Sequence, residues 1–360
     1  MLLSGTLSAR VTPPPPPPPI RLPILSLPNQ NAHDLTDKGY VSLVKLGDRG
    51  KSFKALIDTG SADFWVPSET STTLGTHSGI GRASSNTLHV TNTQFSIGYE
   101  DGSGVAGKVG ADTLTLGRIS VPQVPVGVAD TVQGNLVASR ADGILGLATS
   151  RKSRMGQHTV VETLFARQAI PGQLFGLKLP RLADRNAGEL SLGAPNFSKF
   201  DANSQAVSTN TRSDGLYGAR VAGLTVNNVR IPITSAIFDV GAESITAPGN
   251  AGGQFNRAIP GAIVQPQAGG STLSIIPCND QRTLASVILV TIQGKTFQIQ
   301  ARDLVGSFVA PIQNVNYCLS LVQDSRSRAT GEWVFGIPFL KNVYSIFDDG
   351  QNKVTFARLT

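Results

Sequence analysis

Two short Asp-x-Gly turns, one in each half of the chain, constrain the fold more than any other feature of the sequence. Residues 55–66 read ALIDTGSADFWV, so that an apolar run enters a tight turn at Asp58 and Gly60 and a second apolar run leaves it. Residues 236–245 read AIFDVGAESI and place Asp239 in a similar turn. One such turn is an ordinary loop signal, because Asp, Gly and Ser are common turn residues. Two of them, spaced by about one domain, indicate a duplicated unit with one carboxylate in each half.

Length and composition favour an all-β protein with two lobes. The 360 residues suffice for two separate hydrophobic cores. Only 15% of the residues are charged, 38 are glycine, and short runs of Val, Ile, Thr and Leu recur between turn residues. Lys and Arg outnumber Asp and Glu by 31 to 24, but no basic cluster interleaved with aromatic residues stands out. We therefore do not expect nucleic-acid binding.

The chain divides into an arm and two lobes. Residues 1–37 predict a flexible arm, because seven prolines at 13–19 favour an extended polyproline segment over a packed element. A β pattern begins after the arm, so we expect an N-terminal lobe at 38–187 and a C-terminal lobe at 188–360. Apolar residues at helical spacing predict one short helix at 160–169.

Six motifs along the chain resemble those of the pepsin-like aspartic peptidases, family A1. They are the two Asp turns, a Tyr-containing hairpin turn, a strand late in the first lobe, the entry to the second lobe and a carboxyl-terminal pattern. In chain order they occupy 55–66, 97–103, 141–147, 188–193, 236–245 and 333–348. The resemblance spans residues 38–360 and implies a fungal-type secreted member. The fold that it implies is a bilobal acid protease with two β-barrel-like lobes, a few short helices and no cofactor.

The resemblance implies that Asp58 and Asp239 are the catalytic pair. Two carboxylates that face each other cannot easily both ionise, so they share one proton over a broad acidic range. The ionised one can take a proton from water while the protonated one polarises the scissile carbonyl. Such an endopeptidase needs neither a covalent intermediate nor a metal. Its expected partners are peptide or protein substrates and pepstatin-like inhibitors.

The same resemblance assigns supporting roles around this pair. Tyr99 would be the tyrosine of a flap that closes over the substrate, and the indole of Trp65 would support it. Ser61 would donate a hydrogen bond to Asp58. The flap and the substrate cleft would be formed by Tyr99, Asp101, Gly102, Ser103, Gly60, Gly241 and Glu243. The catalytic pair would be supported by Thr59, Ser61, Trp65, Val240 and Ala242.

The second Asp turn departs from the family pattern. The usual Asp-Thr-Gly-Thr/Ser is here Asp-Val-Gly-Ala, followed by Glu243. Val240 lacks the hydroxyl that would interlock with Thr59, and Ala242 cannot donate to Asp239. With the added charge of Glu243, these changes predict that the pair titrates at a higher pH. Three interpretations stay open: an active endopeptidase, a weak or inactive homologue that binds peptides, and a form blocked by its own arm.

The two cysteines, Cys278 and Cys318, give information on the cellular compartment of the protein. The resemblance implies that they form a disulfide in the second lobe, where it would close a loop of about 40 residues and contribute roughly 4 kcal/mol. Two buried free thiols are the alternative. A disulfide implies an oxidising compartment, so we expect an extracellular or vacuolar monomer. No run of about 18 apolar residues indicates a membrane span, and the first ten residues are too short and weakly apolar for a secretion signal.

Overall fold

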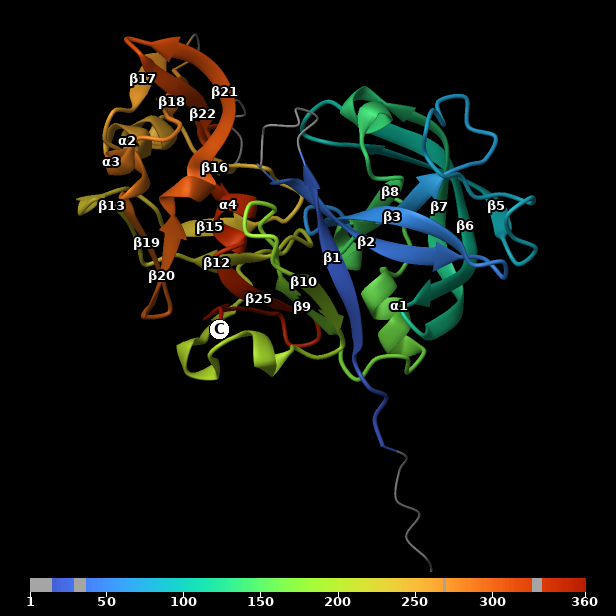
Figure 1. Cartoon of the computed structure of the whole chain (residues 1–360). Helices are drawn as coiled ribbons and strands as arrows, with labels where there is room; N and C mark the ends of the chain where they lie inside the picture. Colours follow the sequence, from blue (N-terminus) through green and yellow to red (C-terminus); the bar gives the residue numbers. More distant parts are fainter. Residues whose placement is uncertain (1–14, 29–36, 268–269, 326–331) are drawn as a thin grey trace, which may run out of the picture.

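The computed structural model describes residues 15–28, 37–267, 270–325 and 332–360. Figure 1 shows two lobes, one formed by the first half of the chain and one by the second, on either side of strand β1. Strands dominate both lobes, and the helices are few and short. The predicted all-β, bilobal fold is confirmed.

The N-terminal lobe is built from seven strands and one α-helix. The helix, α1 (Val160–Ala166), forms because Thr159 accepts a hydrogen bond from the Glu162 backbone while the Glu162 side chain accepts one from the Thr159 backbone. It ends earlier than predicted, and Gln168 beyond it has a positive φ of 56°. The strands of this lobe are β2 (Asp37–Leu46), β3 (Lys51–Asp58), β4 (Phe64–Pro67), β5 (His89–Gly98), β6 (Gly104–Leu116), β7 (Ile119–Gln133) and β8 (Gly143–Gly146).

An antiparallel sheet joins the two lobes, in the order β11-β26-β25-β9-β10-β1-β2. Aromatic side chains fill the core beneath it, where the rings of Phe175 and Phe347 stack with their centroids 5.1 Å apart. This sheet fixes one lobe against the other. Its strands outside the N-terminal lobe are β1 (Ile20–Pro28), β9 (Leu174–Lys178), β10 (Gly188–Leu192), β11 (Ala206–Thr209), β25 (Val343–Asp348) and β26 (Lys353–Arg358).

The C-terminal lobe holds the remaining strands and helices. Its strands are β12 (Gly218–Arg220), β13 (Gly223–Val226), β14 (Val229–Arg230), β15 (Ser235–Phe238), β16 (Ile245–Ala247), β17 (Ile263–Pro266), β18 (Thr272–Pro277), β19 (Val287–Ile292), β20 (Lys295–Gln300), β21 (Val305–Ile312), β22 (Val315–Ser320), β23 (Val322–Asp324) and β24 (Trp333–Phe335). Its α-helices are α2 (Ala251–Arg257), α3 (Gln281–Leu284) and α4 (Ile337–Leu340). Short 3-10 turns across the chain are η1 (Gly134–Ala138), η2 (Ser150–Lys152), η3 (Phe197–Lys199), η4 (Ala202–Ser204) and η5 (Ala301–Leu304).

The same strand arrangement occurs once in each lobe. In the first, β3 pairs in parallel with β8, and β8 pairs antiparallel with β4. In the second, β15 pairs in parallel with β24, and β24 pairs antiparallel with β16. In both lobes the first strand of the set leads into an Asp-x-Gly turn. The internal duplication inferred from the two turns is therefore a duplication of local topology.

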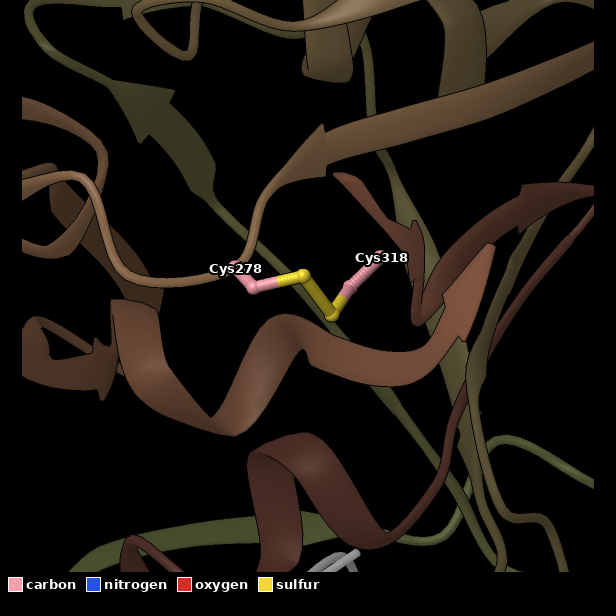
Figure 2. Close-up of a disulfide and its surroundings, with 2 residues drawn as sticks. All are labelled: Cys278 and Cys318. Atoms are coloured by element: carbon pink, nitrogen blue, oxygen red, sulfur yellow. A yellow bond between two sulfur atoms is a disulfide. The ribbon is translucent and has the colours of Figure 1, made fainter. Parts of the chain in front are cut away.

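The predicted disulfide is confirmed. Cys278 follows β18 and Cys318 lies on β22, and Figure 2 shows their side chains meeting between these segments. Their Cα atoms are 5.1 Å apart and neither cysteine is free. The bond closes a 40-residue separation within the C-terminal lobe. The alternative of two free thiols is excluded.

The prediction of an unpacked arm through residue 37 is wrong for β1. Residues Ile20–Ile24 pair with β10, and the later part of β1 pairs with β2. Ile20, Leu22 and Ile24 alternate with exposed residues and are buried in the core that the two lobes share. The reason is the period-2 apolar pattern, which directs every second side chain inward despite the neighbouring prolines. The rest of the predicted arm, at 1–14 and 29–36, lies outside the described residues.

Two matched substitutions in β1 test this packing. Leu22 is 2% exposed and Leu25 is 50% exposed. Leu22→Ala should lower the free energy of unfolding by about 2–5 kcal/mol, because it opens a cavity in a packed core. Leu25→Ala should change it by no more than about 0.5 kcal/mol. Urea unfolding followed by tryptophan fluorescence measures both, and equal effects would show that β1 does not pack in this way.

Candidate active site

Each catalytic candidate sits where a buried strand ends. Asp58 is the last residue of β3, and its backbone carbonyl accepts a hydrogen bond from Leu147 at 2.7 Å. Asp239 directly follows β15, and its backbone N–H donates to Phe335 at 3.1 Å. Most apolar residues of both strands are buried in the core, so neither strand can shift without disturbing it. The sequence thus fixes the backbone from which each carboxylate projects.

A hydroxyl joins the two turns across the lobe interface. Thr59 Oγ1 donates to the carbonyl of Phe238 at 3.2 Å and accepts from the backbone N–H of Val240 at 2.9 Å. Both contacts are buried and link residues from opposite lobes. Val240 cannot reciprocate because its side chain has no polar atom. A pair of threonines would make such contacts in both directions. Here only the contacts made by Thr59 are present, and one of them satisfies the Val240 N–H.

The two glycines let the carboxylates approach each other. A Cβ atom on Gly60 would lie 2.5 Å from Oδ2 of Asp239, and one on Gly241 would lie 2.3 Å from Oδ1 of Asp58. Real side chains do not tolerate such distances, so each turn needs a residue without a Cβ. Each carboxylate packs over the glycine of the opposite turn. This brings Asp58 and Asp239 together as one pair.

The donors that reach the two carboxylates differ in kind and distance. Asp58 accepts from the Gly60 N–H at 2.8 Å on one oxygen and from the Ser61 hydroxyl of its own turn on the other. Asp239 accepts from the Gly241 N–H at 2.8 Å and, at the longer distance of 3.4 Å, from the Thr59 hydroxyl of the opposite turn, and Ala242 has no side-chain donor to add. Burial, and then the negative charge of Asp58, raise the pKa of Asp239 well above its usual range. Within the pair, Asp239 is the group that keeps a proton.

Glu243 plays a different part from the one predicted. It was expected to raise the titration of the pair through its negative charge. Its carboxylate instead forms an ion pair with Lys38, with Nζ and Oε2 3.3 Å apart, and its side chain is 52% exposed. A neighbouring cation and solvent both offset the field of this charge at Asp239. The raised pKa of Asp239 rests on burial and on Asp58 instead.

Tyr99 begins the turn that joins β5 and β6 into a hairpin, and its side chain contacts Trp65. The indole Nε1 of Trp65 donates to the Tyr99 hydroxyl at 2.8 Å, and Tyr99 packs against the buried cluster that contains Trp65. The backbone of Tyr99 donates to Ser103 at 2.9 Å and accepts from Gly102 at 3.1 Å, which closes a tight turn. Gly102 has a φ of +83°, a conformation that favours glycine.

Asp101 holds this turn together. Its carboxylate accepts from the backbone of Ser103 at 2.9 Å, from the Ser103 hydroxyl at 2.6 Å and from Asn135 at 3.1 Å. Burial acts to raise the pKa of Asp101, but the hydrogen bonds from Ser103 outweigh it and the pKa is lowered. Asp101 and Ser103, predicted as cleft residues, therefore bond to each other and shape the turn that carries Tyr99.

Three residues near the site were not anticipated from the sequence. Lys38 pairs with Glu243 from the opposite lobe. Asp63 is buried and accepts from the Ser153 hydroxyl at 2.5 Å and from the Arg154 backbone at 2.7 Å, which fixes the segment after the first turn. Glu100 is exposed beside Tyr99, and its charge contributes to the raised pKa of Asp239. Asp63 and Glu100 lie within recognised motifs, whereas Lys38 does not, and a long-range pairing such as that of Lys38 has no local sequence signal.

Among the residues that the structure describes, no group of three or more His, Cys, Asp or Glu side chains is arranged to hold a metal ion. Both carboxylates of the pair are engaged by backbone and hydroxyl donors. The arrangement is suited to proton transfer between two carboxyl groups and a bound water molecule.

Comparison with known proteins agrees with this geometry. The sequence profile described as "Eukaryotic aspartyl protease" matches residues 39–359. Aspartic-type endopeptidase ctsD of Aspergillus fumigatus is 27% identical over 340 residues, which cover 89% of this chain and 66% of that protein. Gastricsin of Cavia porcellus is 28% identical over 345 residues, covering 89% and 80%. Rhizopuspepsin-4 of Rhizopus niveus is 26% identical over 333 residues, covering 91% and 79%.

The chain belongs to the eukaryotic aspartyl protease family, the pepsin-like family A1. The match spans nearly all of the described fold, including both Asp turns. This chain covers 66% of the length of the Aspergillus protein and 62% of the length of a related protein from Trichophyton verrucosum, which is less than two thirds in each case.

The thermal stability of an Asp239→Asn variant should depend on pH in a defined direction. The raised pKa of Asp239 means that its proton stabilises the fold at low pH, and that this stabilisation is lost as the pH rises through the folded-state pKa. Asparagine removes the repulsion at all pH values. The variant should therefore melt about 2 °C or more above the wild type near pH 8 and match it near pH 4.

Differential scanning calorimetry at the two pH values makes this measurement. Asp130→Asn is the control, because Asp130 is exposed and lies outside the pair. A variant that melts below the wild type near pH 8 would show that the two carboxylates do not repel each other there.

Proposed function

We propose that this protein is an aspartic-type endopeptidase that hydrolyses internal peptide bonds with water activated between Asp58 and Asp239. The observation that supports this most is the closely packed pair of carboxylates, held by hydrogen bonds between the two turns and supplied with unequal donors. Unequal donors separate the roles of base and acid within a coupled pair.

In the proposed reaction, Asp58 acts as the base. It takes a proton from the bound water, and the water oxygen attacks the scissile carbonyl carbon. Asp239 gives its proton to the carbonyl oxygen, so a neutral tetrahedral diol forms. Asp58 then passes its proton to the amide nitrogen, the carbon–nitrogen bond breaks, and Asp239 recovers a proton from the diol. Every proton returns to its starting group, and no cofactor is consumed.

The hairpin that carries Tyr99 supplies the second part of the proposal. Its turn closes over an extended peptide and excludes bulk water, which strengthens the electrostatic interactions at the catalytic pair. The hydrogen bond from Trp65 fixes the Tyr99 ring, and burial raises the pKa of Tyr99, so this side chain stays neutral. Peptides, unfolded proteins and pepstatin-like inhibitors are the proposed ligands of this monomer.

One observation favours a weaker enzyme or a peptide-binding homologue as a second candidate. Val240 and Ala242 replace two hydroxyl groups of the second turn, so Asp239 lacks the side-chain donor that Ser61 gives to Asp58. We rank this candidate second because the raised pKa of Asp239 is suited to a general acid.

We further propose an extracellular or vacuolar location. The disulfide between Cys278 and Cys318 supports an oxidising compartment. No helix among the described residues has the length and apolar character needed to cross a bilayer.

Digestion of a denatured protein substrate, from about pH 2 to about pH 7, tests the proposed activity. Asp58→Asn and Asp239→Asn should each lower the rate by at least about a hundredfold, because each removes a proton-transfer group. Pepstatin should abolish the wild-type activity. Circular dichroism of both variants serves as the control for folding.

Two results would contradict the proposal. Asp239→Asn protein that keeps most of its activity would show that the pair is not the catalytic group. Wild-type protein that binds pepstatin but cleaves nothing across this pH range would favour the peptide-binding homologue.

A further inference from the structure

Glu243 lies on the open side of the second Asp turn. Within the segment after Asp239, Val240 and Ile245 are buried, whereas Gly241 and Glu243 are exposed. Gly241 packs against the carboxylate of Asp58, so its exposed face borders the catalytic pair. Glu243 lies two residues further along the same turn, and its side chain is also exposed.

The corresponding residue of the first turn is buried. Counting from the aspartates, Ala62 is the counterpart of Glu243, and it is 2% exposed. The side chain of Glu243 is 52% exposed. The duplicated turns therefore differ in what they offer to a ligand, because at this position the second turn has an exposed charged side chain and the first has a buried alanine.

Lys38 restrains the carboxylate of Glu243 from the opposite lobe. Lys38 Nζ contacts one carboxylate oxygen at 3.3 Å. Its neighbour Asp37 is buried and fixed by Lys341 Nζ at 3.2 Å and by the Leu182 backbone at 3.1 Å, so the start of β2 is held firmly. No other hydrogen bond or ion pair engages Glu243 among the residues that the structure describes. A carboxylate offers about four acceptor positions, and Lys38 occupies part of this capacity.

We propose that Glu243 binds a lysine or arginine side chain of the peptide substrate, with Lys38 holding the carboxylate in place. The proposal rests on the proposed function, because it takes a peptide to be the ligand of the cleft. A cationic side chain can bind the free part of the Glu243 carboxylate without displacing Lys38. Glu243 then selects one side chain of the substrate, while the catalytic pair acts on the backbone.

The net charge of the protein indicates that a preference for lysine would depend on direct contact with Glu243 and not on long-range attraction. The chain carries a formal charge of +7, which disfavours the approach of basic peptides at long range. A preference for lysine must then come from direct contact with an acidic group, and salt should weaken it only modestly once the peptide covers the pair. The preference should therefore appear in the dissociation constant rather than in the association rate.

Binding of non-hydrolysable peptides tests the proposal without requiring catalysis. Fluorescein-labelled peptides with a reduced scissile bond carry lysine at one position at a time, and norleucine is the uncharged match. Fluorescence anisotropy near pH 5.5, about one unit above the ordinary pKa of a glutamate, gives the Kd of each peptide. At one position the wild-type protein should bind the lysine peptide about fivefold more tightly than the norleucine peptide.

Three variants test whether Glu243 causes this preference for lysine. Glu243→Gln should make the affinities for the lysine and norleucine peptides about equal, so that the ratio of the two affinities is about one. Lys38→Met should lower the ratio, because the carboxylate of Glu243 is then no longer held in place. Asp184→Asn is the matched control: Asp184 forms an exposed ion pair with Arg302 at 2.7 Å, so its loss should leave the ratio unchanged. Melting temperatures verify that each variant is folded.

The proposal is overturned if no position favours lysine, or if the preference survives in Glu243→Gln. It is also overturned if Asp184→Asn removes the preference as fully as Glu243→Gln does. These outcomes are distinct from a failure of the proposed function. A protein that favours lysine through Glu243 but hydrolyses nothing would retain the recognition site and lose only the assignment as an enzyme.

Discussion

The hydroxyl of Thr59 is the contact on which the rest of the site depends. It belongs to the first lobe, and both of its buried hydrogen bonds are made to the backbone of the second. Because these bonds fix the relative position of two turns, they also fix the distance between two carboxylates that repel each other when both are ionised. Desolvation and this repulsion keep a proton on Asp239. The same hydroxyl also lies 3.4 Å from Oδ1 of Asp239, so one side chain both joins the two turns and contacts the carboxylate that keeps the proton.

The two lobes carry similar Asp turns, as a duplication would produce, but the two turns differ in the residues around each aspartate. Both lobes use a parallel pair of strands to carry an aspartate, and both need a glycine under the opposite carboxylate. Ser61 remains as a donor in the first turn, whereas Ala242 stands in the second. An unequal pair is suited to a reaction that needs one base and one acid. The second turn also carries Glu243, whose side chain is exposed, where the first turn has the buried Ala62.

Most of the fold was predictable because local patterns determined it. The Asp turns, the hairpin that carries Tyr99 and helix α1 each have short-range signals, namely a turn residue, an apolar period or a capping box. Strand β1 was missed because the adjacent prolines dominate the composition, although Ile20, Leu22 and Ile24 alternate as a strand should. The disulfide was available only as an implication of the family resemblance.

The members of the candidate site remain predictions from the sequence, and the pairings among them had no local signal. Asp101 was expected in the flap and substrate cleft, and its carboxylate bonds to Ser103 of its own turn and to Asn135. Glu243 was expected to act on the catalytic pair, and its partner Lys38 lies far away in the sequence. Such contacts depend on how two lobes meet, which no local pattern encodes.

The most direct test of this account compares Thr59→Val with Thr59→Ser. Valine keeps the shape of threonine but removes both cross-lobe hydrogen bonds and leaves the buried N–H of Val240 unpaired, at a cost of about 1–3 kcal/mol. Serine keeps the hydroxyl. Peptidase turnover of the valine variant should fall by more than about tenfold, while the serine variant stays close to the wild type. A valine variant with wild-type turnover would show that the carboxylate pair is held together by something other than the Thr59 hydroxyl.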